Sequence, residues 1–203
     1  MFSQIAGPTE GVLLLPPGKY TLAISSPDTE PTEVSFEVAN HDLKLDAIHL
    51  AAGIAQYYGH AAPALGDVEP VNAGAFSADG LRGKWVLIYF WGHWCTPCIN
   101  AALPKLAHFY EQNLQNKGRF EMVAVHENGV AGRITVAELK EKLASLEKQK
   151  WGKALPFPVL LDRAGEVIRT WGISVYPTTA IIRPDGVLIR GDLETLSNEL
   201  NVK

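Results

Sequence analysis

The sequence predicts an α/β fold, with a central mixed sheet flanked by helices, preceded by a small antiparallel β module. Three observations predict it. Residues 85–91, WVLIYFW, form a continuous apolar run, which is typical of a strand buried on both faces. From that run onward, strand-like and helix-like segments alternate. Before residue 50, by contrast, the chain shows strand alternation and turn signals without a helical period.

The first fifty residues read as short strands separated by turns, at residues 12–15, 20–25, 33–38 and 43–50. Four strands make a thin core, so either strands are missing at the N-terminus or the module packs against the next part of the chain. We therefore predict a small β-sandwich-like module, complete or truncated. It would occupy residues 1–50, with a connector over 51–80 that begins the second domain, and the α/β domain over 81–203.

The elements of the second domain are predicted from hydrophobic period and capping signals. A helix should begin at the cysteines and bury one stripe, namely Leu103, Leu106, Tyr110 and Leu114. Thr135 and Glu138 have the spacing of a capping box, and the buried stripe after them is Val136, Leu139, Leu143 and Leu146. Strands are predicted at 120–126 and 157–162, a short helix or turn at 165–171, a hairpin at 178–183 and 187–190, and a last helix at 193–200.

Composition excludes some partners. The net charge is −4 and no cluster of Lys and Arg stands out, so we expect neither nucleic acid nor an anionic membrane as a partner. The longest apolar run near the start is four residues, too short for a transmembrane span or a signal peptide. Membrane association is expected only through a segment that is not present in this chain.

Both cysteines, Cys95 and Cys98, lie in the segment WGHWCTPC at residues 91–98. If Cys95 stands at the mouth of a helix, Pro97 falls in the first turn, where its missing N–H costs nothing. The free N–H groups and the helix dipole stabilise a thiolate on Cys95. Cys98, one turn further, is shielded but can attack a mixed disulfide on Cys95. The pair therefore predicts thiol–disulfide exchange, with an exposed nucleophile and a buried resolving cysteine.

Two other interpretations of the pair stay open at this point. The cysteines could only pack in the core, although a C-x-x-C with an internal proline at a strand-to-helix turn is hard to explain by packing. They could also be half of a zinc site. Structural zinc takes about four ligands, however, and the histidines show no H-x(3–5)-H spacing. We predict no metal and no cofactor.

The chain resembles the thioredoxin superfamily, and more narrowly its TlpA/ResA-like group of thiol–disulfide oxidoreductases. The likeness covers roughly residues 62–203. It is carried by the spacing between two segments, GKWVLIYFWGHWCTPC at 83–98 and FPVLLDRAGEVIRTWGISVYPTTAIIRPDG at 157–186. The resemblance implies a thioredoxin-like fold and a redox-active dithiol that works without a cofactor.

The resemblance also implies roles for residues around the dithiol. Pro177 would be a cis-proline that faces the sulfurs, and the substrate backbone would pair next to Tyr176. A proline directly before an apolar strand also belongs at a strand end. Thr96 and Pro97, between the cysteines, tune the redox potential. Trp94 is expected to form an apolar rim of the substrate surface.

The chain departs from the family pattern behind the sulfurs. Tyr89 stands where thioredoxins have a buried Asp, Ala101 replaces the Glu of ResA-like proteins, and Pro104 lies six rather than five residues after Cys98. The acid that would move protons to and from Cys98 is therefore missing. Tyr89, His93 or water could substitute, and an imidazolium at His93 would favour the thiolate. Alternatively, Tyr89 is a core aromatic residue and His93 an exposed loop residue.

The predicted function is an enzymatic one. Cys95 would exchange disulfides with protein disulfide or dithiol substrates, and an unidentified electron donor or acceptor would recycle the dithiol. Two alternatives are a non-catalytic binding or scaffolding module on a thioredoxin fold, and a thiol peroxidase. The P-x-x-x-[TS]-x-x-C context of the peroxidases is absent before Cys95.

The N-terminal module loosely resembles carboxypeptidase-regulatory-like β-sandwich repeats through the stretch LPPGKYTLAI. Such modules often precede redox domains in bacterial cell-envelope proteins. The resemblance therefore implies an extracytoplasmic location, in the periplasm or cell envelope, although the chain carries no signal peptide.

Overall fold

A computed structural model describes residues 12–72 and 76–201. The chain forms two compact units, and each is described by itself. The second unit consists of residues 25–30 together with the chain from residue 51 onward, and the first comprises the other residues up to 50. The turn at residues 25–30 is thus part of the second unit, although it lies within the N-terminal sequence.

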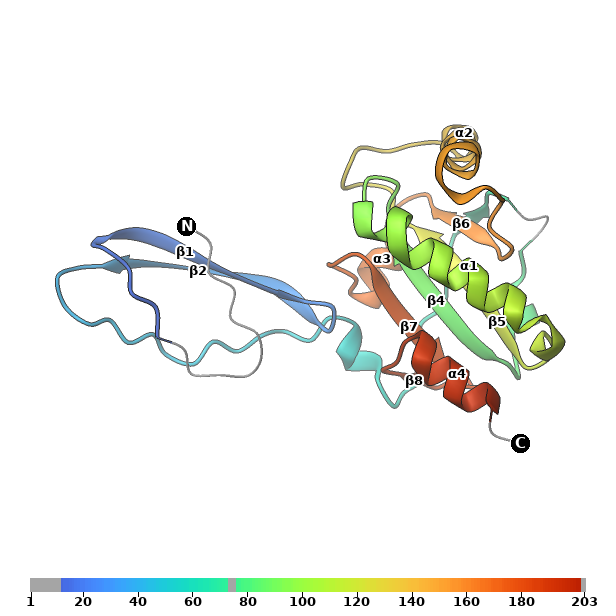
Figure 1. The fold of residues 1–203 in the computed structure, drawn as a ribbon. Helices are drawn as coiled ribbons and strands as arrows, with labels where there is room; N and C mark the ends of the chain where they lie inside the picture. The colour runs from blue at the N-terminus through green and yellow to red at the C-terminus, as the bar shows by residue number, and fades with distance from the viewer. Residues whose placement is uncertain (1–11, 73–75, 202–203) are drawn as a thin grey trace. The chain divides into compact units, whose positions relative to one another are not determined.

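The N-terminal residues form a two-stranded sheet of β1 (Gly18–Ser26) and β2 (Thr29–Val38), drawn in blue in Figure 1. Both strands alternate between exposed and half-buried side chains, and the rings of Tyr20 and Phe36 stack across them at 5.8 Å.

The prediction of four strands in this region is wrong. Within residues 12–50 the structure has two strands, and neither 12–15 nor 43–50 is one of them. Val12 and Leu14 are 91% and 95% exposed. Neither the apolar run at 12–15 nor the alternation at 43–50 produced a strand, because a strand needs a partner and a face to bury as well as a suitable sequence pattern.

The second unit is built on a six-stranded sheet in the order β3-β6-β5-β4-β7-β8. The central strands β4, β5 and β6 run parallel, while β3, β7 and β8 pair antiparallel with their neighbours. Their bounds are β3 Val68–Pro70, β4 Trp85–Trp91, β5 Phe120–His126, β6 Val159–Asp162, β7 Thr178–Ile182 and β8 Leu188–Ile189. This is the mixed central sheet that the sequence predicts.

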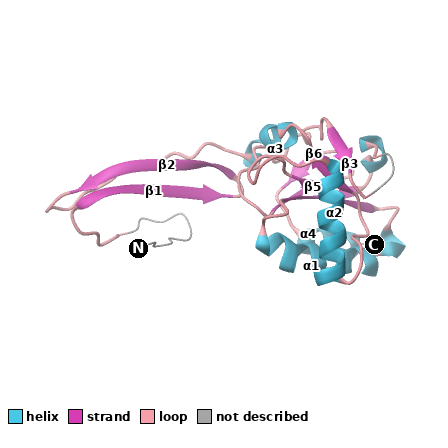
Figure 2. Cartoon of the chain, turned by 90° about the horizontal axis from the view of Figure 1, so that it is seen from above, coloured by secondary structure: helices cyan, strands magenta, loops and turns pink. Residues whose placement is uncertain are grey.

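Helices cover both faces of this sheet, as Figure 2 shows. One face packs against α1 (Leu103–Gln112), α2 (Val136–Leu146) and α4 (Leu193–Asn201), and the other against α3 (Glu166–Trp171). The alternation of β4 serves both layers, because Leu87, Tyr89 and Trp91 enter one apolar cluster and Val86, Ile88 and Phe90 the other. The continuous apolar run of β4 is thereby explained.

Most elements of this unit were predicted from the sequence. The strand at 120–126 and the capping box of Thr135 and Glu138 are confirmed. Leu114 is a correction: it is 51% exposed, because α1 ends at Gln112 and a separate 3-10 turn comes after it. Within the connector, β3 pairs with β6 at the edge of the sheet. No helix in the described ranges is long and apolar enough to cross a membrane.

Candidate active site

The two cysteines lie where β4 ends and a helix begins. Helical structure starts at Thr96, and the Ile99 N–H donates to the Cys95 carbonyl oxygen over 3.1 Å. Cys95 and Cys98 form a disulfide with Cα atoms 5.2 Å apart. In this oxidised form Cys95 is only 3% exposed, so the expected exposed nucleophile is not seen. Its sulfur is bonded to Cys98 within a buried apolar cluster.

The helix opens with a π-helical segment, Cys98–Ala102, before α1. The Leu103 N–H donates to the Cys98 carbonyl oxygen, a span of five residues that accommodates one more residue than an α-helical turn. This extra residue accounts for Pro104 lying six residues after Cys98. Because Pro104 has no N–H, it cannot donate a hydrogen bond to the Ile99 carbonyl oxygen. That oxygen instead accepts a 2.9 Å hydrogen bond from Trp151 Nε1.

The loop before β7 lies beside the dithiol end of β4. Phe90 pairs with Thr178 in the antiparallel register, which brings Pro177 alongside the last residue of β4. The Tyr176–Pro177 peptide bond is cis, as the resemblance implies. The Thr178 hydroxyl donates to the Val175 carbonyl over 2.6 Å and closes this loop on itself.

Two aromatic residues connect the segment just before Cys95 with the loop that carries Pro177, called the proline loop below. The rings of Trp94 and Tyr176 meet edge to face with their centroids 5.5 Å apart. Trp94 is 37% exposed, whereas Trp91 is fully buried. Burial raises the pKa of the Tyr176 phenol, and the nearby carboxylate of Glu127 adds to this shift. The phenol therefore stays neutral at physiological pH.

A buried carboxylate that the sequence pattern did not reveal holds Trp94 in place. Glu127, 3% exposed, comes directly after β5 and accepts a hydrogen bond from Trp94 Nε1. Its other oxygen accepts the Gly129 and Val130 N–H groups, each over 2.9 Å. The only available signal was the polar segment HEN after an apolar strand, and this gives no hint of its partner.

Gly92 is required by the same arrangement. A Cβ atom at this position would lie 2.6 Å from Trp94 Nε1, closer than real Cβ contacts allow. The indole therefore lies directly against the backbone of Gly92 and is hydrogen-bonded to Glu127.

His93 and His126 form a stacked pair beside this tryptophan. Their ring centroids are 5.2 Å apart, and the His93 N–H donates to His126 Nε2 over 3.0 Å. Burial, together with the adjacent His93, lowers the pKa of His126 to about 3. Burial and then Lys142 also lower the pKa of His93. Both rings are therefore neutral near pH 7, and the expected imidazolium at His93 is disfavoured.

Tyr89 lies in the same apolar cluster as both cysteines and is 2% exposed. Burial raises its pKa, so the hydroxyl keeps its proton. Among the residues that the structure describes, this hydroxyl has no hydrogen-bond partner. The side chain is thus a core aromatic whose hydroxyl is an unused donor in the apolar cluster that contains both cysteines. In the described ranges, no three His, Cys, Asp or Glu side chains are placed to hold a metal ion.

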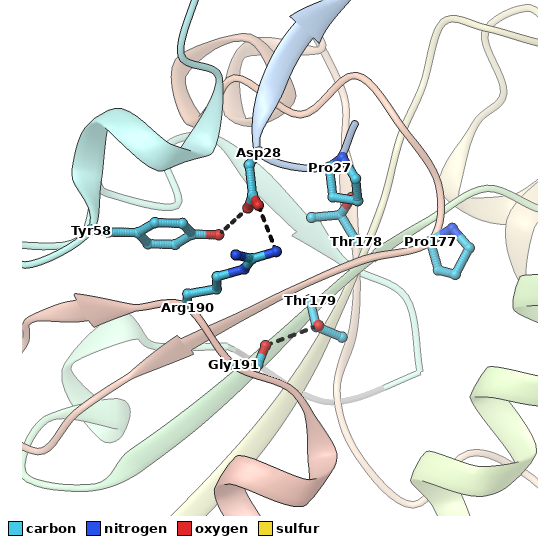
Figure 3. Close-up of a pocket in the computed structure, with 8 residues that line it drawn as sticks. All are labelled: Pro27, Asp28, Tyr58, Pro177, Thr178, Thr179, Arg190 and Gly191. Atoms are coloured by element: carbon cyan, nitrogen blue, oxygen red, sulfur yellow. Dashed lines mark hydrogen bonds and ion pairs between the residues drawn. The ribbon is translucent and has the colours of Figure 1, made fainter. Parts of the chain in front are cut away.

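A small hollow of about 180 Å³ begins at the proline loop, as Figure 3 shows. Asp28, Tyr58 and Arg190 converge at one end, and Pro177 lies at the other. The Tyr58 hydroxyl donates to Asp28 over 2.8 Å, and Arg190 Nη2 lies 3.0 Å from the same carboxylate. The remaining lining residues are Pro27, Thr178, Thr179 and Gly191.

Comparison with known proteins places these features in context. Residues 59–190 match the AhpC/TSA family. The chain is 29% identical over 133 residues to the thiol-disulfide oxidoreductase ResA of Bacillus subtilis (strain 168), an alignment that covers 66% of each protein. For the ResA proteins of two other Bacillus species, the chain spans about half of the relative's length.

Solved structures share the fold. A thiol-disulfide isomerase from Corynebacterium glutamicum superposes with a TM-score of 0.53 at 19% identity, covering 65% of this chain and 88% of that one. A pneumococcal exposed lipoprotein thioredoxin from Streptococcus pneumoniae strain TIGR4 superposes with a TM-score of 0.50 at 25% identity. That alignment covers 66% of this chain and 95% of the pneumococcal one.

Proposed function

Because the chain belongs to the AhpC/TSA family and has a cysteine pair at the start of a helix, we propose that it is a thiol–disulfide oxidoreductase acting on proteins. The observation that carries the proposal is the Cys95–Cys98 disulfide beside the Pro177 loop. A pair that forms and breaks a disulfide at this position can exchange it with another protein. The similarity to ResA supports the same activity.

The exchange proceeds in two steps. The Cys95 thiolate attacks one sulfur of a substrate disulfide, forms a mixed disulfide and releases the other substrate sulfur as a thiolate. The Cys98 thiolate then attacks the Cys95 sulfur, which forms the Cys95–Cys98 disulfide and releases the second substrate sulfur. The substrate gains two electrons and the dithiol loses them. An electron donor must then reduce the Cys95–Cys98 disulfide back to the dithiol. In the opposite direction, an electron acceptor must oxidise the dithiol to the disulfide.

Neighbouring residues support this exchange. Trp94, Tyr176 and Pro177 would form the surface that meets the substrate backbone, while Thr96 and Pro97 tune the potential of the couple. For proton transfer we propose the neutral Tyr89 hydroxyl and the neutral His93 ring. Tyr89 belongs to the apolar cluster that contains both cysteines, His93 lies two residues before Cys95, and neither needs to carry a charge.

The proposal also includes a division of the chain into domains and a cellular location. Residues 1–50 would be an accessory module, 51–80 a connector, and 81–203 the redox domain. The protein would work outside the cytoplasm, in the periplasm or cell envelope. The similarity to a lipoprotein thioredoxin described as exposed supports that location.

Reduction of insulin by dithiothreitol tests the activity. The wild type should accelerate the reaction, and Cys95→Ser should not, because the attacking sulfur is lost. Cys98→Ala should accumulate mixed disulfides on Cys95, which non-reducing gels and mass spectrometry detect. The proposal fails if the wild-type rate equals that of Cys95→Ser.

A further inference from the structure

The hollow in Figure 3 shares a wall with the loop that would hold the substrate backbone. Pro177, Thr178 and Thr179 form that wall, at the start of β7. Its volume of about 180 Å³ is below the usual range of roughly 300–1,000 Å³ for small-molecule sites. It therefore suits a single side chain of a bound polypeptide better than a cofactor.

The opposite wall, the turn at residues 25–30, is fixed to the second unit by its backbone. The Gly53 N–H donates to the Asp28 carbonyl over 3.0 Å, and the Glu30 N–H donates to the Ala51 carbonyl over 2.9 Å. The Ser174 hydroxyl adds a bond of 3.1 Å to the Thr29 carbonyl. From the turn, these bonds use only backbone atoms, and the Asp28 carboxylate faces the hollow, where it contacts Tyr58 and Arg190.

The two charges at the end of the hollow differ in how firmly they are held. The Asp28 side chain is only 22% exposed and receives the Tyr58 hydroxyl as well as the Arg190 guanidinium. Arg190 is 78% exposed. Ion pairs with such an exposed partner contribute little, because water solvates the released cation well. A second cation can therefore replace Arg190 on Asp28, while Arg190 turns into solvent.

We propose that this hollow is a subsite for a basic side chain, lysine or arginine, of the protein substrate, near the cysteine that reacts with Cys95. The inference rests on the proposed oxidoreductase function and adds a substrate preference to it. Asp28 is the recognising group, and Arg190 occupies the subsite until substrate arrives. The N-terminal turn would thus supply a specificity determinant to the redox unit.

Disulfide-linked peptides test the preference. A matched set carries lysine, alanine or glutamate one to three residues on either side of the reactive cysteine. The rate of exchange with the reduced protein is followed by tryptophan fluorescence and chromatography. With the wild type, the best lysine peptide should react about tenfold faster than its glutamate counterpart, the size of a charge-assisted contact.

Variants of Asp28 and Arg190 should change the ratio of the lysine-peptide rate to the glutamate-peptide rate in opposite directions. Asp28→Asn keeps an acceptor for Tyr58 and the backbone bonds of the turn, but should bring the ratio close to one. Arg190→Gln removes the competing cation and should raise the ratio. Asp67→Asn, at an exposed position outside the hollow, changes the net charge equally and should leave the ratio unchanged. Thermal unfolding confirms that each variant is folded.

The outcomes separate this inference from the proposed function. If no peptide exchanges with the wild type, the oxidoreductase proposal fails. If all peptides exchange at equal rates, or if Arg190→Gln lowers the lysine preference, only the subsite is refuted. Reduction of the Cys95–Cys98 disulfide by dithiothreitol, a small uncharged reagent, should proceed equally in all variants.

Discussion

Glu127 uses both of its carboxylate oxygens, one for the Trp94 indole and one for two backbone N–H groups. It is therefore a positioning residue: it acts through Trp94, whose ring contacts Tyr176 in the proline loop. A buried carboxylate is tolerated there because three donors replace its hydration.

Replacing Glu127 by glutamine should loosen Trp94 without removing it. Glutamine has one acceptor oxygen, so its NH₂ group must oppose either the indole N–H or the two backbone N–H groups. We expect a loss of about 1–3 kcal/mol in the free energy of unfolding. We also expect a red-shifted Trp94 emission and a several-fold higher KM for insulin with kcat little changed.

A double-mutant cycle with Trp94→Phe provides the control for this prediction. Phenylalanine keeps an aromatic ring but cannot donate to Glu127. If the two residues act together, the double variant should lose less stability than the sum of the single losses. Strict additivity would contradict the role of Glu127 as the partner that orients Trp94.

His126 makes stability depend on pH. Its pKa in the folded protein is lowered to about 3, from an ordinary value of 6.5, by burial and by the neighbouring His93. Above pH 6.5 the ring is neutral in both states and contributes no pH dependence. Between pH 6.5 and about 3 the unfolded chain binds a proton that the folded protein excludes. The free energy of unfolding therefore decreases as the pH is lowered through this range.

The effect of His126 should reach about 2 kcal/mol at pH 5, at roughly 1.4 kcal/mol per pH unit. Urea unfolding of the wild type at pH 7.5, 6 and 5 measures the slope. His126→Gln, which cannot titrate, should show a shallower decline over the same interval. An equal slope in both proteins would mean that His126 is protonated in the folded state.

At the scale of elements, the first turns of the helix that begins after Cys95 depend on a residue far along the chain. The Ile99 carbonyl, which Pro104 cannot serve, accepts Trp151 Nε1 from a second π-helical segment, Glu147–Trp151, after α2. The side chain of Lys150, in the same segment, reaches the Asn100 amide oxygen over 2.6 Å.

Trp151→Phe should cost about 1–3 kcal/mol in the free energy of unfolding, because it leaves a backbone carbonyl without its partner while largely keeping the ring. Lys150→Ala is the matched control: its contact is exposed, and the loss should stay below about 0.5 kcal/mol. Chemical denaturation measures both. Equal losses of unfolding free energy in the two variants would show that the buried indole hydrogen bond stabilises the protein no more than the exposed Lys150 contact.

Elements with a strong local pattern could be predicted from the sequence, and those that depend on distant partners could not. The apolar run of β4 and the capping box before α2 are local signals, and both are confirmed. The segment 43–50 alternates without becoming a strand, whereas the short β3 pairs at the edge of the sheet. Glu127 was missed for the same reason, since its partner Trp94 lies 33 residues away.

At the scale of the whole molecule, one segment of the N-terminal sequence belongs to the second compact unit rather than to the first. The change of composition near residue 50 predicted a boundary, but the turn at 25–30 belongs to the second unit. Hydrogen bonds from this turn to the chain around residue 52 create the exception. No local pattern in the turn reveals them.

Hydrogen exchange can test this membership. The Glu30 N–H and the Gly53 N–H are bonded to the Ala51 and Asp28 carbonyl oxygens, so they should exchange slowly. The amides of residues 43–50, which lie outside any strand, should exchange much faster. The central strand β4 gives the slow reference. Rapid exchange at both Glu30 and Gly53 would contradict the fixed turn on which the basic-residue subsite depends.

The proline after the π-helical segment also has an evolutionary consequence. Pro104 lacks an N–H, so the Ile99 carbonyl one turn earlier has no helical donor, and the Trp151 indole supplies the hydrogen bond instead. A proline five residues after Cys98 would leave a helix carbonyl without its donor in the same way. In an alignment of many relatives, the presence of this proline and of a hydrogen-bond donor at position 151 should therefore covary.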